Sequence, residues 1–296
     1  MEFGLCLPNY GETSTPHGLV EFAKEAEDLG FSSLWATDHL LMSANSNTPY
    51  EWMFESITTL AYVAALTRRV KLGVSSLVMG LRNPVVVAKQ LATLDQLTGG
   101  RVILATGAGW YAREFENLGM DYHTRGHRLD ESLRLIAELW YTKGPLSFYG
   151  RHLPHKIREG VFEPKPAQPH IEVFVAGNSM AAIRRSLKYA DGWHPNLYPL
   201  SVFSKLVKEY RALEGSATKK IVVRVGYDAT RSEVEYTSPQ GERRVLLSGD
   251  LEKNARLIAE LESLGVSGMV LAPNYNGRVS VDDQLKAIRL FASRFL

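Results

Sequence analysis

The sequence alternates between short apolar runs and longer stretches in which apolar residues recur at helical spacing, and this alternation most constrains the fold. Eight runs of strand length are separated by eight main helical stretches. The predicted strands cover residues 3–7, 33–37, 70–78, 101–106, 171–175, 192–194, 221–227 and 268–271. Strands joined by helical crossovers lie parallel in one sheet, and eight such units in about 300 residues are typical of an α/β (β/α)₈ TIM barrel. An open, doubly wound sheet is the main alternative.

Two segments interrupt this alternation. The main helices are predicted at 17–29, 54–66, 84–97, 125–141, 179–189, 200–213, 251–264 and 281–295, with a short one at 112–118. Residues 144–168 are rich in Gly and Pro and are expected to be an insertion with a hairpin, and 232–247 a second, irregular insertion. We expect both insertions to line or cover the ligand pocket. No linker or change in composition divides the chain, so we expect one barrel domain over 1–296.

Composition excludes several classes of partner. The formal net charge of +2 is too close to neutral to indicate nucleic acid, and no run of Lys and Arg indicates a membrane surface. No apolar window reaches the roughly 18 residues of a transmembrane helix. Cys6 is the single cysteine, which excludes an internal disulfide and fits a reducing compartment. Because no leader peptide is recognisable, we expect a cytoplasmic protein that acts on a small molecule.

The loops at the carboxyl ends of the strands should form one site, because reactive groups in TIM barrels lie there. The segments that follow the predicted strands are polar, glycine-rich or aromatic. They are Pro8-Asn9-Tyr10, Asp38-His39, Ser75-Ser76, Gly107-Ala108-Gly109-Trp110, Ala176-Gly177-Asn178-Ser179, His194-Pro195-Asn196, Asp228 and Ala272-Pro273-Asn274. We expect these segments to share one mouth.

Asp38 and His39 are the candidate catalytic residues. They follow directly on the second predicted strand. A histidine can exchange protons near neutral pH and can donate a hydrogen bond to a reacting atom. The alternative is structural: Asp38 would cap local backbone and His39 would be a hydrogen-bonded imidazole of the framework.

Two glycine-containing strand ends are candidate cofactor-binding loops. Gly107-Ala108-Gly109 begins a G-x-G-x-x-A pattern, but it follows the fourth strand and lacks the acidic strand end of a dinucleotide-binding fold. Its glycines still allow a ligand to approach the backbone, unless they only form a tight turn. Ala176-Gly177-Asn178-Ser179 precedes a helix and can bind a phosphate there, or simply cap the helix. We expect Arg184 and Arg185, further along this helix, to face solvent.

Aromatic residues near the mouth are candidate substrate-binding residues. Tyr10, Trp52, Trp110 and Trp193 lie at or near the predicted mouth loops. Their rings can stack on a flat ligand, or they can pack on their neighbours as a lid. No spacing of His, Cys, Asp and Glu predicts a metal site, since the isolated His123 and His127 pair is weak evidence.

Several motifs occur in an order that resembles one known family. They are Phe3-Gly4, Leu7-Pro8, Glu27-Asp28-Leu29-Gly30-Phe31, Leu34-Trp35, Asp38-His39, Val70-Lys71-Leu72-Gly73, Arg82-Asn83-Pro84, Leu94-Asp95, Leu97-Thr98-Gly99-Gly100-Arg101, Gly107-Ala108-Gly109-Trp110 and Tyr189-Ala190-Asp191-Gly192-Trp193. Together they resemble the bacterial luciferase-like superfamily of flavin- and coenzyme F420-dependent oxidoreductases. Each motif is modest alone, but the ordered set spans nearly the whole chain.

The resemblance implies a cofactor site in the barrel mouth. The isoalloxazine-like ring would lie against the ends of the second to fourth strands, beside Asp38, Ser75-Ser76 and Gly107-Ala108-Gly109, with the phosphate on Gly177-Asn178-Ser179. Ser75-Ser76 aligns with a non-prolyl cis peptide that many family members carry, and His39 aligns with their active-site histidine. The resemblance also implies a homodimer.

The resemblance leaves the cofactor open between F420 and FMN. The Asp-His pair and the short frame resemble the F420-dependent branch, which implies hydride transfer to or from a small organic substrate. The sugar- and alcohol-oxidising members carry a tryptophan a few residues after the histidine, whereas this chain has Leu40-Leu41-Met42-Ser43-Ala44. Oxidation of glucose 6-phosphate or an alcohol is therefore in doubt. The alternatives are an FMNH₂-dependent monooxygenase and a barrel that binds the cofactor without turnover.

Overall fold

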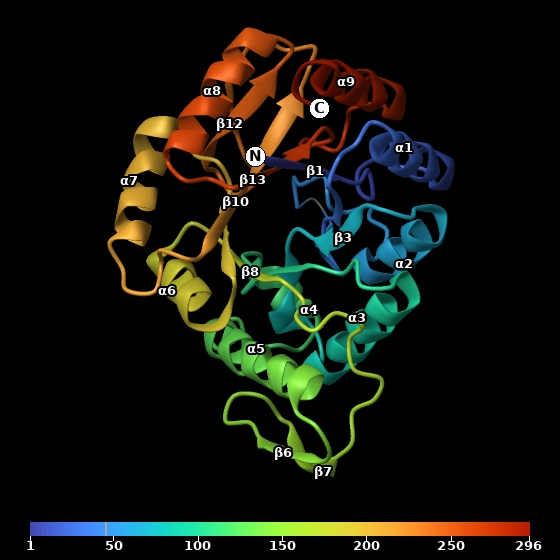
Figure 1. The fold of residues 1–296 in the computed structure, drawn as a ribbon, viewed down its shortest axis with the longest axis vertical. Coiled ribbons are helices and arrows are strands. Elements are labelled where there is room, and N and C mark those ends of the chain that lie inside the picture. Colours follow the sequence, from blue (N-terminus) through green and yellow to red (C-terminus); the bar gives the residue numbers. More distant parts are fainter. Residues whose placement is uncertain (45) are drawn as a thin grey trace.

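The computed structural model describes residues 1–44 and 46–296, and its strands form the predicted barrel (Figure 1). The barrel strands are β1 (Glu2–Cys6), β2 (Ser33–Ala36), β3 (Lys71–Val74), β4 (Leu77–Val78), β5 (Leu104–Gly107), β8 (Val173–Ala176), β9 (Gly192–His194), β10 (Lys220–Asp228) and β13 (Gly268–Ala272). They pair in parallel in the order β3-β2-β1-β13-β10-β9-β8-β5-β4. The prediction of a (β/α)₈ barrel is confirmed.

The third barrel strand is interrupted, so it appears at both ends of this order. We predicted one strand over 70–78, but β3 and β4 are separated by a cis peptide between Ser75 and Ser76. β3 pairs with β2 and β4 pairs with β5, while a parallel bridge from Leu72 to Val102 joins β3 to the segment before β5. The two halves of one strand therefore nearly close the barrel.

Helices surround the strands on all sides (Figure 1). They are α1 (Pro16–Asp28), α2 (Ser56–Leu66), α3 (Pro84–Thr98), α4 (Ala112–Asn117), α5 (Arg125–Tyr141), α6 (Met180–Tyr189), α7 (Leu200–Arg211), α8 (Leu251–Ser263) and α9 (Val281–Phe295), with a 3₁₀ turn at Met79–Leu81. Their ends follow local capping rules. Before α3 begins at Pro84, the Asn83 side chain accepts a hydrogen bond from the backbone N–H of Val85. Gly99 ends the helix in the left-handed conformation. None of the helices within the described ranges is both long and apolar enough to cross a membrane.

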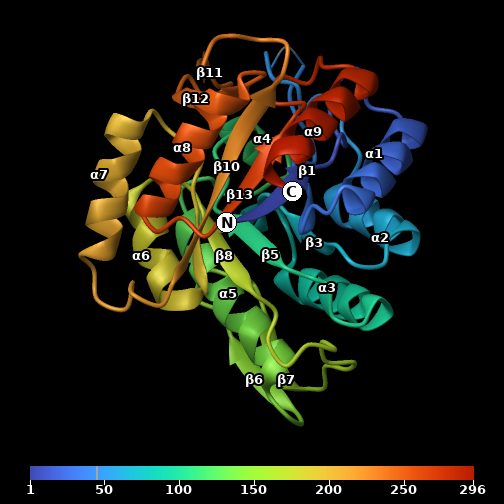
Figure 2. The same ribbon diagram turned by 45° about the horizontal axis from the view of Figure 1, so that its top comes forward.

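The first insertion forms the predicted hairpin, and it lies away from the mouth. β6 (Leu146–Tyr149) pairs antiparallel with β7 (Lys156–Gly160). The pair extends beyond α5 at the bottom of Figures 1 and 2. The Glu131 carboxylate on α5 accepts hydrogen bonds from the N–H groups of 151–153, which anchors the hairpin tip to the helix. The expectation that this insertion covers the pocket is wrong.

The second insertion is more regular than we predicted. Residues 232–247 contain β11 (Glu235–Thr237) and most of β12 (Arg243–Ser248), which pair antiparallel. β12 also pairs in parallel with the carboxyl end of β10, where Gly226 lies opposite Leu246. The apolar run Val245-Leu246-Leu247 is buried there. Because this strand depends on a partner supplied by the barrel, its local sequence did not identify it.

Candidate active site

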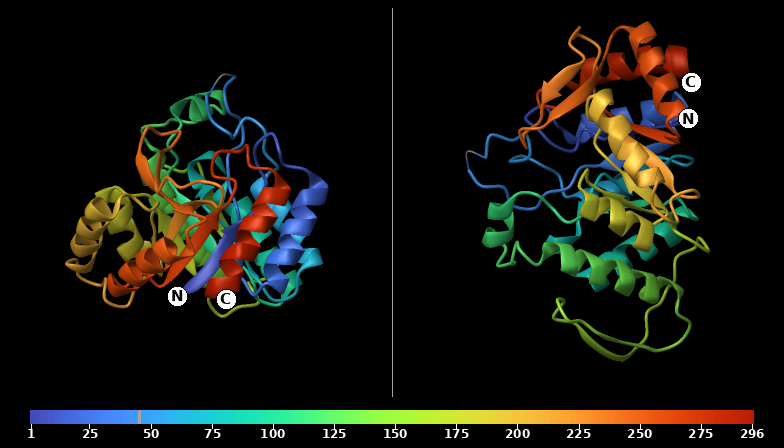
Figure 3. Two further views of the ribbon diagram at one scale, coloured as in Figure 1. Left: turned by 90° about the horizontal axis from the view of Figure 1, so that it is seen from above. Right: turned by 90° about the vertical axis from the view of Figure 1, so that its left-hand side faces the viewer.

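A cavity of about 470 Å³ opens at the carboxyl ends of the strands and brings most of the predicted site residues together. Those that line it are Asp38, His39, Ser75, Ser76, Gly107, Ala108, Gly109, Trp110, Ala176, Gly177, Asn178 and Ser179. Figure 3 shows the loop after β2 and α4 on this side of the barrel, opposite the chain termini. The β11–β12 segment contributes Gln240, Glu242 and Arg244, so this insertion does line the pocket, as predicted.

His39 is held at the cavity by a buried carboxylate. Its Nδ1 lies 2.7 Å from Glu114 Oε2 on α4, and the two side chains are 6% and 1% exposed. Glu114 Oε1 also accepts from the backbone N–H groups of Leu40, at 2.5 Å, and Leu41, at 3.2 Å. Because the carboxylate accepts the Nδ1 proton, Nε2 is the imidazole atom available to a ligand.

Aromatic rings fix the orientation of this imidazole. Tyr50 stacks on His39 with ring centroids 4.8 Å apart, and Trp110 meets it edge-on at 5.9 Å. All three residues line the cavity. A flat substrate near His39 would therefore also contact aromatic surface, which agrees with the predicted placement of Trp110 at the mouth.

The sequence analysis missed Glu114. Burial alone raises the pKa of this carboxyl, but the hydrogen bond from His39 and the N–H groups of Leu40 and Leu41 outweigh burial, so its pKa lies below the usual range. Glu114 is therefore an anion at neutral pH. The signal available in the sequence was an acidic residue in the first turn of the helix that follows a strand end.

Replacing Glu114 with glutamine should lower stability in a pH-dependent way. A carboxyl whose pKa is lower in the folded state stabilises the fold above its unfolded pKa, and this contribution is lost as the pH falls through the folded value. We expect the free energy of unfolding of E114Q to be about 2 kcal/mol lower than that of wild type at pH 7. This difference should shrink below about pH 4.5, the ordinary pKa of a glutamate carboxyl. Urea unfolding at pH 7 and pH 3.5 measures it, and a pH-independent difference would contradict this account.

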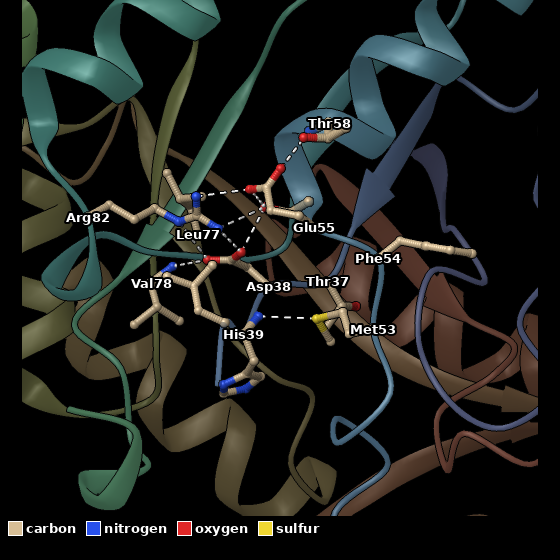
Figure 4. A network of polar contacts seen from close by, with 12 residues as sticks. Thr37, Asp38, His39, Met53, Phe54, Glu55, Thr58, Leu77, Val78 and Arg82 are labelled. Carbon is tan, nitrogen blue, oxygen red and sulfur yellow. Dashed lines mark hydrogen bonds and ion pairs between the residues drawn. The ribbon is translucent and has the colours of Figure 1, made fainter. Parts of the chain in front are cut away.

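Asp38 points away from His39 and is hydrogen-bonded to residues of the surrounding fold (Figure 4). Its carboxylate accepts hydrogen bonds from Ser56 Oγ at 2.7 Å and Val78 N at 2.9 Å, and from the Arg82 guanidinium at 2.5 and 3.3 Å. Arg82 Nη1 also lies 2.9 Å from Glu55. These bonds use the acceptor capacity of a carboxylate. The geometry therefore fits the structural alternative for Asp38 and does not favour proton transfer by it.

Small side chains form the floor of the cavity. Ser75 Oγ donates to His194 Nε2 at 2.8 Å, and His194 Nδ1 donates to Val222 O at 2.6 Å. This direction follows because burial lowers the pKa of His194 to about 4, which leaves its ring neutral. A Cβ at Gly107 would lie 3.3 Å from Ser76 Oγ and 3.6 Å from Ala176 Cβ. A side chain at position 107 would therefore crowd Ser76, and glycine leaves the backbone uncovered at this point.

The loop before α6 lines the cavity, and its two polar side chains bond to the backbone of this chain, as in the capping alternative. Gly177 adopts a φ angle of +118°. Ser179 caps the helix, because its Oγ accepts a hydrogen bond from the backbone N–H of Ala182. The Asn178 side chain exchanges two hydrogen bonds with the backbone of Asn196, so its amide fixes the loop rather than facing a ligand. Arg185 also lines the cavity, paired with Asp130, so the expectation that it faces solvent is wrong.

Three predicted aromatic residues lie elsewhere. Trp193 is fully buried against Phe203 and Tyr210, and its Nε1 donates to Gly177 O at 2.7 Å. It supports the anion loop from behind, so the prediction that it stacks on a ligand is corrected. Trp52 lines a separate groove outside this cavity, and Tyr10 lies beneath Tyr50 with 1% of its surface exposed.

The residues of the cavity fit a flat ring with an anionic tail. The small floor suits the ring, and the loop at 177–179 presents the start of α6 to an anion. Arg125, stacked over Tyr122, also lines this side of the cavity and has no acidic partner within the described residues. No group of His, Cys, Asp and Glu in 1–44 and 46–296 has the arrangement of a metal site.

Comparison with known proteins gives the same fold and two kinds of relative. The family model described as luciferase-like monooxygenase matches residues 1–227. The chain is 32% identical over 182 residues to the F420-dependent glucose-6-phosphate dehydrogenase of Amycolatopsis mediterranei, covering 60% of this chain and 53% of that one. It is 31% identical over 179 residues to the FMNH₂-dependent dimethylsulfone monooxygenase of Pseudomonas putida, covering 59% and 48%. The match thus spans about half the length of these relatives.

Solved structures agree over the full length. The monooxygenase RslO1 from Streptomyces bottropensis superposes with a TM-score of 0.77 at 19% identity, covering 100% of this chain and 98% of that one. An F420-dependent secondary alcohol dehydrogenase superposes with a TM-score of 0.73 at 18% identity, covering 98% of each. At this level of identity the likeness concerns the fold alone.

Proposed function

Since this chain belongs to the luciferase-like monooxygenase family, we propose that it is an oxidoreductase that transfers a hydride between coenzyme F420 and a small organic substrate. The observation that carries this proposal is the His39–Glu114 pair, whose free Nε2 lies at the cavity. When bound, the deazaflavin supplies a carbon that accepts or donates the hydride. Removing a hydride from a C–H bond beside O–H or N–H also releases a proton, and the His39 imidazole accepts it at Nε2.

Glu114 makes this proton transfer easier. As Nε2 takes up a proton the imidazole becomes a cation, and the buried carboxylate 2.7 Å from Nδ1 stabilises that charge. In the opposite direction the imidazolium returns the proton to the product. The contacts from Tyr50 and Trp110 hold the ring in one orientation for both directions.

We propose that the other predicted residues bind the cofactor. Ser75, Ser76, Gly107, Ala108 and Gly109 would lie under the ring, with Asp38 fixing the strand end beside it. Ala176, Gly177 and Ser179 would receive the phosphate, with Asn178 holding their loop in place. On the family resemblance we also propose a cytoplasmic, single-domain homodimer, whose two copies sedimentation velocity would detect.

An FMNH₂-dependent monooxygenase is the second candidate. The dimethylsulfone monooxygenase relative matches as closely as the F420-dependent one, and the cavity would accept either ring. A barrel that only binds the cofactor is less consistent with the site, because a paired histidine lies within reach of a ligand.

A direct titration separates the two cofactors. We expect F420 to bind the purified protein with micromolar affinity and FMN to bind at least about tenfold more weakly, as monitored by cofactor fluorescence. Micromolar binding of FMN without binding of F420 would reject the preferred proposal in favour of the monooxygenase. Failure of both cofactors to bind would reject both enzymes.

A further inference from the structure

Arg224 is a cation inside the barrel mouth that forms no ion pair with an acidic side chain among the described residues 1–44 and 46–296. It lies on β10 and lines the same cavity as His39. Its Nη1 donates to Ser75 O at 2.5 Å and its Nη2 to Thr37 Oγ1 at 3.0 Å. Cys6 and Tyr10 are among the titratable groups that act on it, and burial raises the pKa of both, so they are uncharged at neutral pH.

A charge in this position usually has a partner. Arg224 is half-buried at the cavity wall, and a guanidinium has five N–H donors, of which these contacts use two. Arg185 and Arg244, which line the same cavity, each pair with a carboxylate. Arg224 therefore has unused donors and an uncompensated charge at the cavity wall, as expected of a residue that binds an anion.

Arg224 lies on the side of the cavity that leads to His39. Both residues line the cavity together with Tyr50, whose ring centroid lies 4.8 Å from that of His39. A recess of about 20 Å³ beside Arg224 is walled by Tyr50 and Tyr236. The proposed phosphate loop has Arg125 from α5 on its side of the cavity, so the cofactor phosphate does not require Arg224.

We propose that Arg224 binds a carboxylate of the substrate, so that the substrate is a small organic acid whose reacting carbon lies toward His39. The planar fork of a guanidinium matches a carboxylate, and Arg224 lines the cavity together with His39. The orientation toward His39 rests on the proposed function, whereas binding of the carboxylate depends only on residues of this chain.

Benzoate and benzamide, which share a ring and differ in charge, test the proposal by calorimetric titration into the full chain. We expect benzoate to bind at least about tenfold more tightly than benzamide to wild type, and R224M to abolish this difference. The exposed Arg278, which lines the separate groove with Trp52, provides a control, and R278M should bind benzoate like wild type. Equal binding of the two probes to wild type, or unchanged benzoate binding to R224M, would overturn the proposal.

R224K provides a second test, because it keeps a positive charge at this position and loses the planar fork. R224K should keep the wild-type melting temperature while binding benzoate several-fold more weakly than wild type. Wild-type benzoate affinity in R224K would show that the guanidinium does not bind the carboxylate. If R224M instead loses only F420 or FMN affinity, Arg224 serves the cofactor and the inference fails. If wild type prefers benzoate to benzamide but binds neither cofactor, the carboxylate site is supported and only the proposed function is rejected.

Discussion

Replacing His39 with alanine should lower kcat by about 10²- to 10⁴-fold, the usual contribution of a positioned acid or base. The cofactor dissociation constant should change by less than about threefold, because the proposed ring and phosphate contacts come from Ser75-Ser76, Gly107–Gly109 and Gly177–Ser179. The reason is chemical: without Nε2 no group at this point takes the proton released with the hydride. Turnover followed by cofactor absorbance, together with a cofactor titration, measures both quantities.

His17→Ala is the matched control for this experiment. The His17 side chain is 92% exposed on α1, so its loss should leave kcat at the wild-type value. If H39A keeps a kcat within about fivefold of wild type, His39 is not the proton-transfer group. If H39A loses cofactor binding along with turnover, His39 acts in binding and the proposed mechanism is wrong.

Replacing Asp38 with asparagine should lower the free energy of unfolding by about 3–5 kcal/mol, the cost of breaking a buried ion pair from one side. The Asp38 side chain is 0% exposed and that of Arg82 is 11% exposed, so D38N leaves a largely buried guanidinium with reduced compensation. Glu55 remains as a partner of Arg82, but it is 33% exposed and lies on one side of the guanidinium only. Urea unfolding of D38N and wild type at pH 7 measures the loss.

A double variant separates the unpaired charge from other causes. D38N/R82M removes both charges, so it should recover part of the stability that D38N loses. D28N, at an exposed aspartate at the end of α1, should unfold within about 0.5 kcal/mol of wild type. If D38N is as stable as wild type and fails only in turnover, Asp38 belongs in the catalytic machinery after all.

The fold was predictable because its pattern is local and repeated. Each barrel strand has its own apolar run, and each helix has its own apolar periodicity and capping residue. The order of strands and helices could therefore be predicted without knowledge of the tertiary contacts. Gly99 and Pro84 even placed both ends of α3 to within one residue. The barrel rule then placed Asp38 and His39 at the mouth, and the cavity that holds His39 agrees with it.

The different roles of Asp38 and His39 were not predictable from the sequence. Adjacent residues point in opposite directions, and each meets a partner distant in sequence: Arg82 lies 44 residues from Asp38, and Glu114 lies 75 residues from His39. Which carboxylate reaches the imidazole depends on where α4 packs over the mouth. Periodicity carries no information about that packing, so the sequence did not indicate that Glu114 meets His39.

Trp193 and Arg224 illustrate the same limit for single side chains. Alternate residues of a barrel strand face inward or outward, and a very short strand such as β9 gives no period from which to choose. Trp193 turned out to face the helices and not the mouth. Arg224 looked like any charged residue in an otherwise apolar strand, and its missing acidic partner became visible only when the neighbouring strands were in place.

The two interruptions of the barrel pattern offer different opportunities for protein engineering. The β6–β7 hairpin contributes nothing to the cavity, so a reporter peptide or affinity tag inserted at its tip should leave substrate choice intact, provided that the backbone contacts of Glu131 are kept. The β11–β12 segment supplies part of the cavity wall and rests on β10, which carries Arg224. Libraries that aim to change substrate choice are best concentrated there.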